Sequence, residues 1–386
     1  MKSAVVVGGS SGIGLGITKA LIDRGYYVYV VANKPNDLNQ LSEEQKDQYE
    51  FVESDLFYYD ESLFKELSNN NNVKLLMITA GFGRVTDFEY LHNTEIDRLM
   101  TINATSVLKI IHDFYHRIRS SEDFYCGVMG SIAGLICSPS FSVYSASKAA
   151  LCRGIESINA ELAANNYNNK ILNVSPGSLK GTGFTGNSTD LSQISIISNN
   201  VINKILAKEE LYIPEYDEVY KDVLKRYHTD PTEFGISSYK YKKDANRIIN
   251  EERLCIGYLS GTFDLFHVGH LNLLKRAKKQ CDYLIVGVHD SGAWKGKETF
   301  VPLEERKEIV ASCKYVDKVV DSCREDSDAW LLWHYNKLFV GSDYQGSERF
   351  KKYEEYFSDK NVKIIYFPYT QSTSSTMLRN KIKNSK

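Results

Sequence analysis

Two stretches of the sequence combine residue types that can do chemistry. The first is G-T-F-D-L-F-H-V-G-H at 261–270, which follows an apolar run at 254–259 and precedes a stretch with helical periodicity at 271–280. This order predicts a strand that passes into a helix at the two histidines. Because the free N–H groups of a helix N-terminus favour anions, His267 and His270 are expected to face one phosphate chain. A nucleoside triphosphate suits such a site.

The second stretch is Y-S-A-S-K at 144–148. Tyr144 and Lys148 are four residues apart and share one face of the helix expected there. A nearby ammonium favours the phenolate, so Lys148 is expected to lower the pKa of Tyr144 from about 10. Ser131 ends an earlier apolar run and can hydrogen-bond a substrate oxygen. These groups suit transfer of a hydride to a carbonyl carbon and of a proton to its oxygen.

The residues of both stretches must be positioned by strands and helices that alternate along the chain. This alternation predicts parallel, doubly wound sheets. Near the N-terminus an apolar strand at 4–7 ends in G-G-S-S-G-I-G, whose glycines permit a tight turn and close approach of a pyrophosphate. The next strand ends at Ala32, where an NAD-binding protein would carry an acidic residue. Asn33 and Lys34 follow. Without a carboxylate to repel a 2′-phosphate, NADP is favoured over NAD.

The expected fold class is therefore α/β, with two Rossmann-like doubly wound parallel-sheet domains in tandem. The boundaries are a first domain at 1–228, a linker at 229–252 and a second domain at 253–386. The linker is polar, with little apolar periodicity. Its charged run from Tyr239 to Asp244 includes Lys242 and Lys243, which could border either active site. We expect this run to be solvated and without function.

The composition is that of an ordinary globular protein, with a net charge of −2, 25% charged and 42% hydrophobic residues. Without a basic excess, neither nucleic acid nor membrane is an expected partner. No apolar run approaches the ~20 residues of a membrane span, and no signal peptide is recognisable. The seven cysteines show neither zinc-site nor disulfide spacing. These features predict a cytoplasmic protein.

The first half resembles the short-chain dehydrogenase/reductase family over about residues 2–225. The resemblance rests on the glycine loop, T-A-G at 79–81, Asn103, Ser131, Y-S-A-S-K and S-P-G-S-L-K-G-T at 175–182. It implies a catalytic group of Asn103, Ser131, Tyr144 and Lys148, in which Asn103 orders a water and Lys148 also holds the nicotinamide ribose. The implied cofactor-binding residues are Gly8, Ser10, Ser11, Gly12, Ile13, Gly14, Asn33, Lys34, Asp55, Ala80, Gly81, Pro176, Gly177 and Thr182. One departure is Thr79, where the family usually has asparagine.

The second half resembles nucleotidyltransferases with an H-x-G-H signature, most closely the glycerol-3-phosphate cytidylyltransferase branch. G-T-F-D, H-V-G-H, L-E-E-R-K, V-G-S-D-Y and S-T-S-S-T occur in that branch's order. The resemblance implies attack of an acceptor phosphate on CTP, with Mg²⁺, His267, His270 and Lys297 stabilising the charge. The implied nucleotide-binding residues are Gly261, Thr262, Phe263, Asp264, Lys295, Arg306, Asp343, Ser374, Ser375 and Thr376, with Asp264 also the metal ligand. Tyr369 stands where the branch has an arginine.

Two catalytic halves predict consecutive steps. NADPH would reduce a ketose phosphate, with ribulose 5-phosphate the leading choice, and CTP would convert the alditol phosphate to a CDP-alditol of the kind used for teichoic acids or capsules. Alternatives are CDP-glycerol or CDP-mannitol synthesis, a first half that only binds dinucleotide or oligomerises, and adenylyl transfer from ATP. By analogy with both families, a dimer or tetramer is expected. The other partners would be small-molecule substrates.

Overall fold

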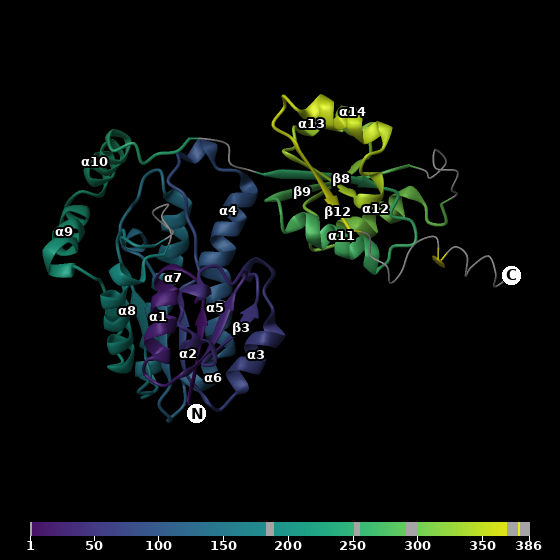
Figure 1. Ribbon diagram of the computed structural model, residues 1–386. Coiled ribbons are helices and arrows are strands. Elements are labelled where there is room, and N and C mark those ends of the chain that lie inside the picture. Colours follow the sequence, from purple (N-terminus) through teal and green to yellow (C-terminus); the bar gives the residue numbers. More distant parts are fainter. Residues whose placement is uncertain (1, 183–188, 251–254, 291–298, 369–376, 379–386) are drawn as a thin grey trace. The chain divides into compact units, whose positions relative to one another are not determined.

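The computed structural model describes residues 2–182, 189–250, 255–290, 299–368 and 377–378 (Figure 1). The chain divides into two compact units, Met1–Glu251 and Glu252–Lys386. Each unit is an α/β domain with one sheet of its own.

The first unit is built on seven parallel strands in the order β3-β2-β1-β4-β5-β6-β7. The chain begins in the middle, winds outward to β3, and then crosses over to β4. The carboxyl ends of β1 and β4 therefore lie side by side, which is where doubly wound sheets bind ligands. The strands are β1 (Ser3–Val7), β2 (Tyr27–Ala32), β3 (Tyr49–Glu53), β4 (Val73–Ile78), β5 (Tyr125–Met129), β6 (Ile171–Val174) and β7 (Leu211–Tyr212).

Helices cover both faces of this sheet (Figure 1). Val5 and Val7 of β1 enter a core with α3, α5 and α7, whereas Ala4 and Val6 enter the opposite core with α1 and α8. Both faces are thus apolar, as parallel sheets require. The helices are α1 (Gly12–Ile22), α2 (Glu43–Lys46), α3 (Glu61–Asn69), α4 (Asn93–Met100), α5 (Ser106–Asp113), α6 (Tyr115–Ile118), α7 (Ser142–Ala164) and α8 (Leu191–Leu206).

The region expected to be a linker is largely helical and packs on the first unit. A π-helical turn, η7 (Tyr216–Tyr220), leads into α9 (Lys221–Thr229) and α10 (Pro231–Asp244). Asp230 caps α10 by accepting from two backbone N–H groups, and Pro231 occupies its first turn. These local signals outweigh the weak apolar periodicity on which the linker prediction was based.

The second unit has five parallel strands in the order β10-β9-β8-β11-β12. Tyr258 points into a core with α13 and α14, and Leu259 into the opposite core with α11 and α12. The prediction of two doubly wound parallel sheets is therefore confirmed. The elements are β8 (Ile256–Gly261), α11 (Val268–Lys278), β9 (Tyr283–Val288), α12 (Leu303–Ala311), β10 (Lys318–Asp321), α13 (Asp326–Trp333), β11 (Lys337–Gly341), α14 (Glu348–Phe357) and β12 (Lys363–Phe367).

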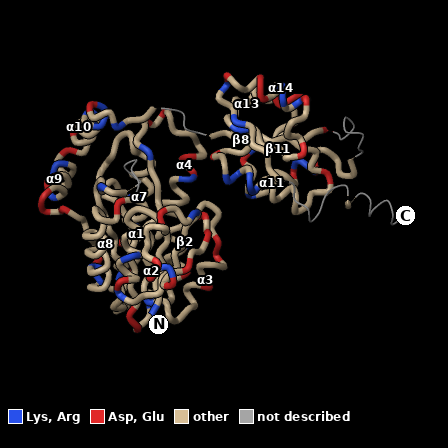
Figure 2. Tube along the Cα trace, in the orientation of Figure 1, with Lys and Arg blue, Asp and Glu red and all other residues tan. Residues whose placement is uncertain are grey.

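Acidic and basic residues are interspersed over each unit (Figure 2). Within the described ranges, no helix is both long and apolar enough to cross a membrane.

Candidate active sites

The glycine loop sits at the crossover between β1 and β4. Gly8 and Gly12 have φ of 83° and 51°, in the left-handed region that glycine tolerates best. A Cβ atom on Gly8 would lie 2.5 Å from the backbone nitrogen of Ala80, so the two loops touch through backbone atoms. Thr79 does not disturb this contact, because its hydroxyl donates to the carbonyl of Val7 over 3.0 Å.

The other expected cofactor residues lie at the same edge of the sheet. Asn33 and Lys34 are exposed directly after β2. The carboxylate of Asp55 accepts from the backbone N–H of Phe57 over 3.0 Å. Thr182 lies beside Gly12, where a Cβ atom would be 3.7 Å from that of the threonine. Ser10, Ser11, Ile13, Gly14, Ala80 and Gly81 belong to the two loops themselves.

Tyr144, Lys148 and Ser131 come together at the ends of α7 and β5, and all three are buried. Burial raises the pKa of Tyr144 to about 12, and a hydrogen bond with Ser131 only partly opposes this. The expected lowering of the Tyr144 pKa is therefore wrong, because burial outweighs the neighbouring groups. Lys148 donates to the carbonyl of Met129 over 2.8 Å, and burial lowers its own pKa to about 8.

Asn103 lies in a π-helical turn, η4 (Thr101–Thr105), which joins α4 to α5. Its side-chain amide donates to the carbonyl of Phe82 (2.9 Å) and to the hydroxyl of Ser147 (3.1 Å), and accepts from the N–H of Phe82 (3.0 Å). A Cβ atom on Gly81 would lie 3.1 Å from Oδ1 of Asn103 and 3.3 Å from Nζ of Lys148. The amide thus holds the loop after β4 against the catalytic helix. Any water-ordering role remains a prediction.

The segment after β6 packs against an unexpected aromatic residue. The carbonyl of Pro176 accepts from the N–H of Ile132 over 2.9 Å. A Cβ atom on Gly177 would lie 1.5 Å from the hydroxyl oxygen of Tyr220, so only glycine fits there. Tyr220 is brought to this place by η7 and was not expected from the sequence.

In the second unit, the signature loop ends as the N-cap of α11. Nδ1 of His267 accepts from the N–H of Gly269 over 3.0 Å, so the neutral ring carries its proton on Nε2. Burial lowers the pKa of His267 and favours this neutral form. The rings of His267 and His270 stack with centroids 4.0 Å apart. Phe263 and Leu265 have φ of 51° and 50°, a strained backbone of the kind found at functional loops.

The expected metal ligand, Asp264, has a structural role in the described part of the chain. Its carboxylate is 1% exposed and accepts from the N–H groups of Phe300 and Val301 over 3.0 and 3.1 Å. It therefore anchors the chain that leads into α12. In the described part of the chain, no group of three His, Cys, Asp or Glu residues is arranged to hold a metal ion. Both bonds end on Oδ1 of Asp264, and its role as a metal ligand stays a prediction.

Arg306, expected to contact nucleotide, is also buried. Its guanidinium donates to four backbone carbonyl oxygens, which lie 2.5 to 2.9 Å away and belong to Thr262, His289, Asp290 and Val301. These bonds use four of its five N–H groups. Arg306 is thus a positioning residue that ties three loops together around the carboxyl end of β8.

The remaining nucleotide-site predictions divide into two groups. Gly261 and Thr262 lie at the end of β8, and Asp343 is exposed in the 3-10 turn η9 (Ser342–Tyr344) that follows β11. Both places are at the carboxyl edge of the sheet. The others, Lys295, Lys297, Ser374, Ser375 and Thr376, lie outside the described residues, as does Tyr369.

Comparisons with known proteins match a different family to each half of the chain. The short chain dehydrogenase family profile matches residues 2–192, and the cytidylyltransferase-like profile matches residues 258–381. The glycerol-3-phosphate cytidylyltransferase of Bacillus subtilis (strain 168) is 33% identical over 126 residues, which is 32% of this chain and 92% of that protein. The ethanolamine-phosphate cytidylyltransferase of Dictyostelium discoideum is 52% identical over 67 residues, 16% of this chain and 19% of that protein.

This chain joins a short-chain dehydrogenase domain to a cytidylyltransferase domain. It is therefore a bifunctional oxidoreductase and nucleotidyltransferase. A solved short-chain dehydrogenase from Streptomyces avermitilis has the same fold as the first domain, with a TM-score of 0.51 at 19% identity, covering 64% of this chain and 100% of the other.

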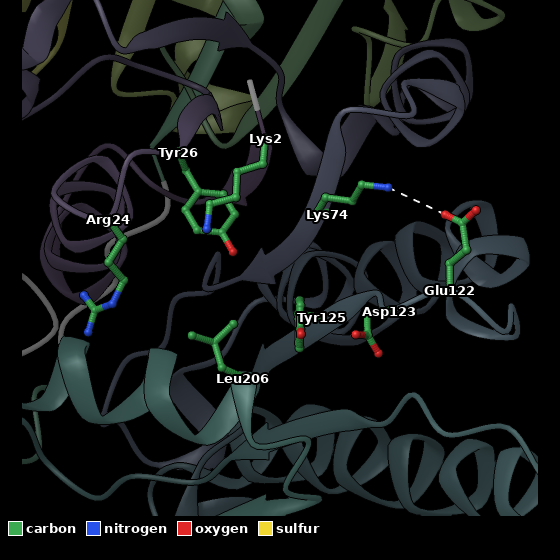
Figure 3. A pocket seen from close by; sticks show the side chains of 8 residues that line it. All are labelled: Lys2, Arg24, Tyr26, Lys74, Glu122, Asp123, Tyr125 and Leu206. Atoms are coloured by element: carbon green, nitrogen blue, oxygen red, sulfur yellow. Dashed lines mark ion pairs between the residues drawn. The ribbon is translucent and has the colours of Figure 1, made fainter.

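The dehydrogenase domain also contains a cavity of about 620 Å³ at the opposite, amino-terminal edge of its sheet (Figure 3). Lys2, Tyr26 and Tyr125 line it, and Lys74 forms an ion pair of 3.6 Å with Glu122 beside it. No residue of the expected dehydrogenase site lines this cavity. It is separate from the chemistry described above.

Thr189 and Asp37, near the glycine loop, were not predicted from the sequence. Thr189 accepts from the N–H of Gly12 over 2.7 Å and donates to the carboxylate of Asp37 over 2.5 Å. The hydrogen bond between Gly12 and Thr189 thus joins residues that are 177 positions apart in the sequence. Only the folded chain brings them together.

Proposed function

We propose that this enzyme makes a CDP-alditol in two steps. The dehydrogenase domain reduces a ketose phosphate with NADPH, and the cytidylyltransferase domain joins the alditol phosphate to CMP from CTP. The observation that supports this is that one chain carries both the Ser131–Tyr144–Lys148 group and the stacked His267–His270 pair. Reduction of a ketose phosphate creates the kind of acceptor that a cytidylyltransferase activates. Ribulose 5-phosphate, giving ribitol 5-phosphate, is the leading substrate.

Reduction needs a proton donor, and Tyr144 is in the right state to be one. With its pKa raised to about 12, the phenol keeps its proton at neutral pH. NADPH, when bound, supplies the hydride to the carbonyl carbon. Tyr144 gives its proton to the carbonyl oxygen, and the phenolate takes a proton back from solvent. Ser131, hydrogen-bonded to Tyr144, stabilises the phenolate and can also hold the substrate oxygen.

Residues after β2 support NADPH over NADH. Ala32 provides no carboxylate that would repel a 2′-phosphate, and the cation of Lys34 is exposed two residues later. At Gly12 a Cβ atom would meet only Thr182, at 3.7 Å or more, so this glycine leaves room for the pyrophosphate to approach the loop backbone.

Cytidylyl transfer is a single displacement at the α-phosphorus. An oxygen of the acceptor phosphate attacks, and the bond to pyrophosphate breaks. Because Nδ1 of His267 is committed to the cap of α11, we expect this residue to donate through Nε2–H to a phosphate oxygen. The N-terminus of α11 adds a favourable field for the same charge. Mg²⁺, if bound together with CTP, would neutralise part of the phosphate charge, and Asp264 would be the residue to hold it.

A second candidate uses the same two steps on a triose phosphate and yields CDP-glycerol. It is favoured by the 33% identity to a glycerol-3-phosphate cytidylyltransferase. The absence of an arginine at Tyr369 argues against it. A hexulose phosphate giving CDP-mannitol is the remaining variant.

The test is a mass-spectrometric assay of the purified enzyme with NADPH, CTP and Mg²⁺. Ribulose 5-phosphate, dihydroxyacetone phosphate and fructose 6-phosphate are supplied separately, and ATP replaces CTP in a parallel series. The proposal expects CDP-ribitol as the main product. Tyr144→Phe should slow NADPH oxidation by about 10²–10⁴-fold, yet leave CDP-ribitol formation from ribitol 5-phosphate intact. Unchanged product from the ketose in Tyr144→Phe would mean that the first domain does not catalyse the reduction.

A further inference from the structure

The segment 231–250, which we name the strap, folds over the loops that border Tyr144. The chain runs from α10 across the first unit toward α4 (Figure 1). At its start, the carbonyl of Pro231 accepts from the thiol of Cys137 over 3.6 Å. At its end, the side chain of Asn250 donates to Asp87 over 2.8 Å. Cys137 and Asp87 belong to the loops that follow β5 and β4.

Those two loops are in direct contact with the catalytic tyrosine. Phe141 stacks on Tyr144 with ring centroids 4.1 Å apart and planes 18° from parallel. A Cβ atom on Gly83 would lie 2.6 Å from the ring of Tyr144. The strap therefore packs on the immediate surroundings of the reacting group, which an inert connector would not do.

Lys242 is a residue of this strap. It was expected to be solvated, and its side chain is half-buried. Its Nζ donates to the hydroxyl of Ser138 over 2.8 Å and to the carbonyl of Pro139 over 2.7 Å. Both acceptors are neutral, and no ion pair joins Lys242 to a carboxylate of the described residues. Burial lowers its pKa to about 8, and the nearby charge of Arg247 adds to that effect.

A half-buried ammonium with a second cation nearby is stabilised by an anion. Two donors of Lys242 are used and the third N–H remains for a further acceptor. The adjacent Lys243 is exposed and so offers a natural comparison.

The position of Lys242 relative to Tyr144 fits the length of a sugar phosphate. Nζ lies 6.0 Å from the ring centroid of Phe141, which stacks on Tyr144. Because the Phe141 and Tyr144 centroids are 4.1 Å apart, Nζ of Lys242 is at most 10.1 Å from the ring centroid of Tyr144. In a pentulose 5-phosphate the carbonyl carbon is separated from the phosphorus by five bonds, or ~6 Å when extended. With a contact of ~3 Å at each end, such a molecule can place its carbonyl at Tyr144 and its phosphate at Lys242.

We propose that Lys242 binds the phosphate group of the ketose that the dehydrogenase domain reduces. This inference rests on the proposed function and names the group that recognises its substrate. The strap then helps to determine which carbonyl compounds the domain accepts.

The test compares each ketose phosphate with its phosphate-free counterpart. Wild type, Lys242→Met, Lys242→Arg and Lys243→Met are assayed for NADPH oxidation with ribulose 5-phosphate and ribulose, and with dihydroxyacetone phosphate and dihydroxyacetone. We expect Lys242→Met to raise KM for the phosphorylated ketose at least tenfold and to change kcat/KM for the free ketose less than twofold. Lys242→Arg should restore most of the affinity, and Lys243→Met should resemble the wild type.

An equal loss of kcat/KM for both members of a pair would show that Lys242 only holds the loop at 138–139, and would overturn the proposal. No change for either would overturn it as well.

A second measurement does not depend on turnover. Lysines are acetylated with acetic anhydride in the presence and absence of inorganic phosphate, and the sites are quantified by mass spectrometry. Phosphate should protect Lys242 more than Lys243. If no ketose phosphate is reduced, the proposed function fails, and this protection alone decides whether Lys242 binds phosphate. If phosphate protects the two lysines from acetylation to the same degree, the proposed site is ruled out.

Discussion

Arg306 donates through Nη1 to the carbonyl oxygen of Thr262 over 2.5 Å, and so ties α12 to the loop that leads to the two histidines. The same guanidinium also holds the chain after β9 through His289 and Asp290. An arginine with its donors committed to carbonyl oxygens has little left for a phosphate. Its contribution to cytidylyl transfer is therefore to the shape of the site.

Replacing Arg306 by methionine should destabilise the cytidylyltransferase domain. Four buried carbonyl oxygens would lose their donor, and we expect the free energy of unfolding to fall by roughly 2–4 kcal/mol. Thermal and urea unfolding measure this. Lys307→Met is the matched control, because Lys307 makes only surface ion pairs and its loss should have a much smaller effect. Unchanged stability with a raised KM for CTP would instead indicate direct nucleotide contact.

Replacing His267 should separate its structural role from its chemical one. Asparagine is a good N-cap, so His267→Asn keeps the acceptor for the N–H of Gly269 while removing the Nε2 donor. We expect kcat for CMP transfer to fall about 10²–10³-fold with little change in stability. His267→Ala should show the same loss of rate and also lose about 1 kcal/mol of stability. Near-normal activity in the asparagine variant would contradict the proposed role.

The pH dependence of NADPH binding should follow Lys148. Its folded pKa of about 8 lies below the ordinary value, so the ammonium is present below pH 8 and lost above it. If the charged form holds the nicotinamide ribose, the Kd for NADPH should rise roughly tenfold between pH 7 and pH 9. Fluorescence titration measures this. Lys242→Met is the control, because Lys242 also titrates near pH 8 and its removal should leave the profile unchanged. If the pH dependence of the Kd for NADPH disappeared in Lys242→Met and persisted in Lys148→Met, its assignment to Lys148 would be wrong.

A carboxylate at the end of β2 should change the choice of cofactor. In Ala32→Asp the new charge would repel the 2′-phosphate of NADPH and accept from the ribose hydroxyls of NADH. We expect kcat/KM to fall at least tenfold for NADPH and to rise for NADH. Initial rates with both cofactors measure the ratio. An unchanged ratio would place the recognition of the 2′-phosphate elsewhere in the domain.

Local patterns were enough to predict most of the sheet. The run at 4–7 was expected as a strand and lies in β1, and the strand expected to end at Ala32 is β2. Buried parallel strands are continuous apolar stretches, so each is recognisable without its neighbours. Shorter or more polar strands were not predicted, among them Ile171–Val174 and Lys318–Asp321. Ile171–Val174 is buried by strands and helices that are distant in the sequence, and Lys318–Asp321 is a partly exposed edge strand.

The types and spacing of residues by themselves determined the two chemistries, because a phenol beside an ammonium and two imidazoles at a helix start are local arrangements. Tertiary structure alone decided what several polar side chains do. Arg306 and Asp264 were expected at a nucleotide and a metal, and the structure gives both of them backbone partners in other loops that no local pattern showed. Lys242 was expected in solvent and lies beside Ser138, 104 residues away in sequence. The physical reason is that the partner of a buried polar group is set by which loops meet in space, and a linear pattern does not contain that information.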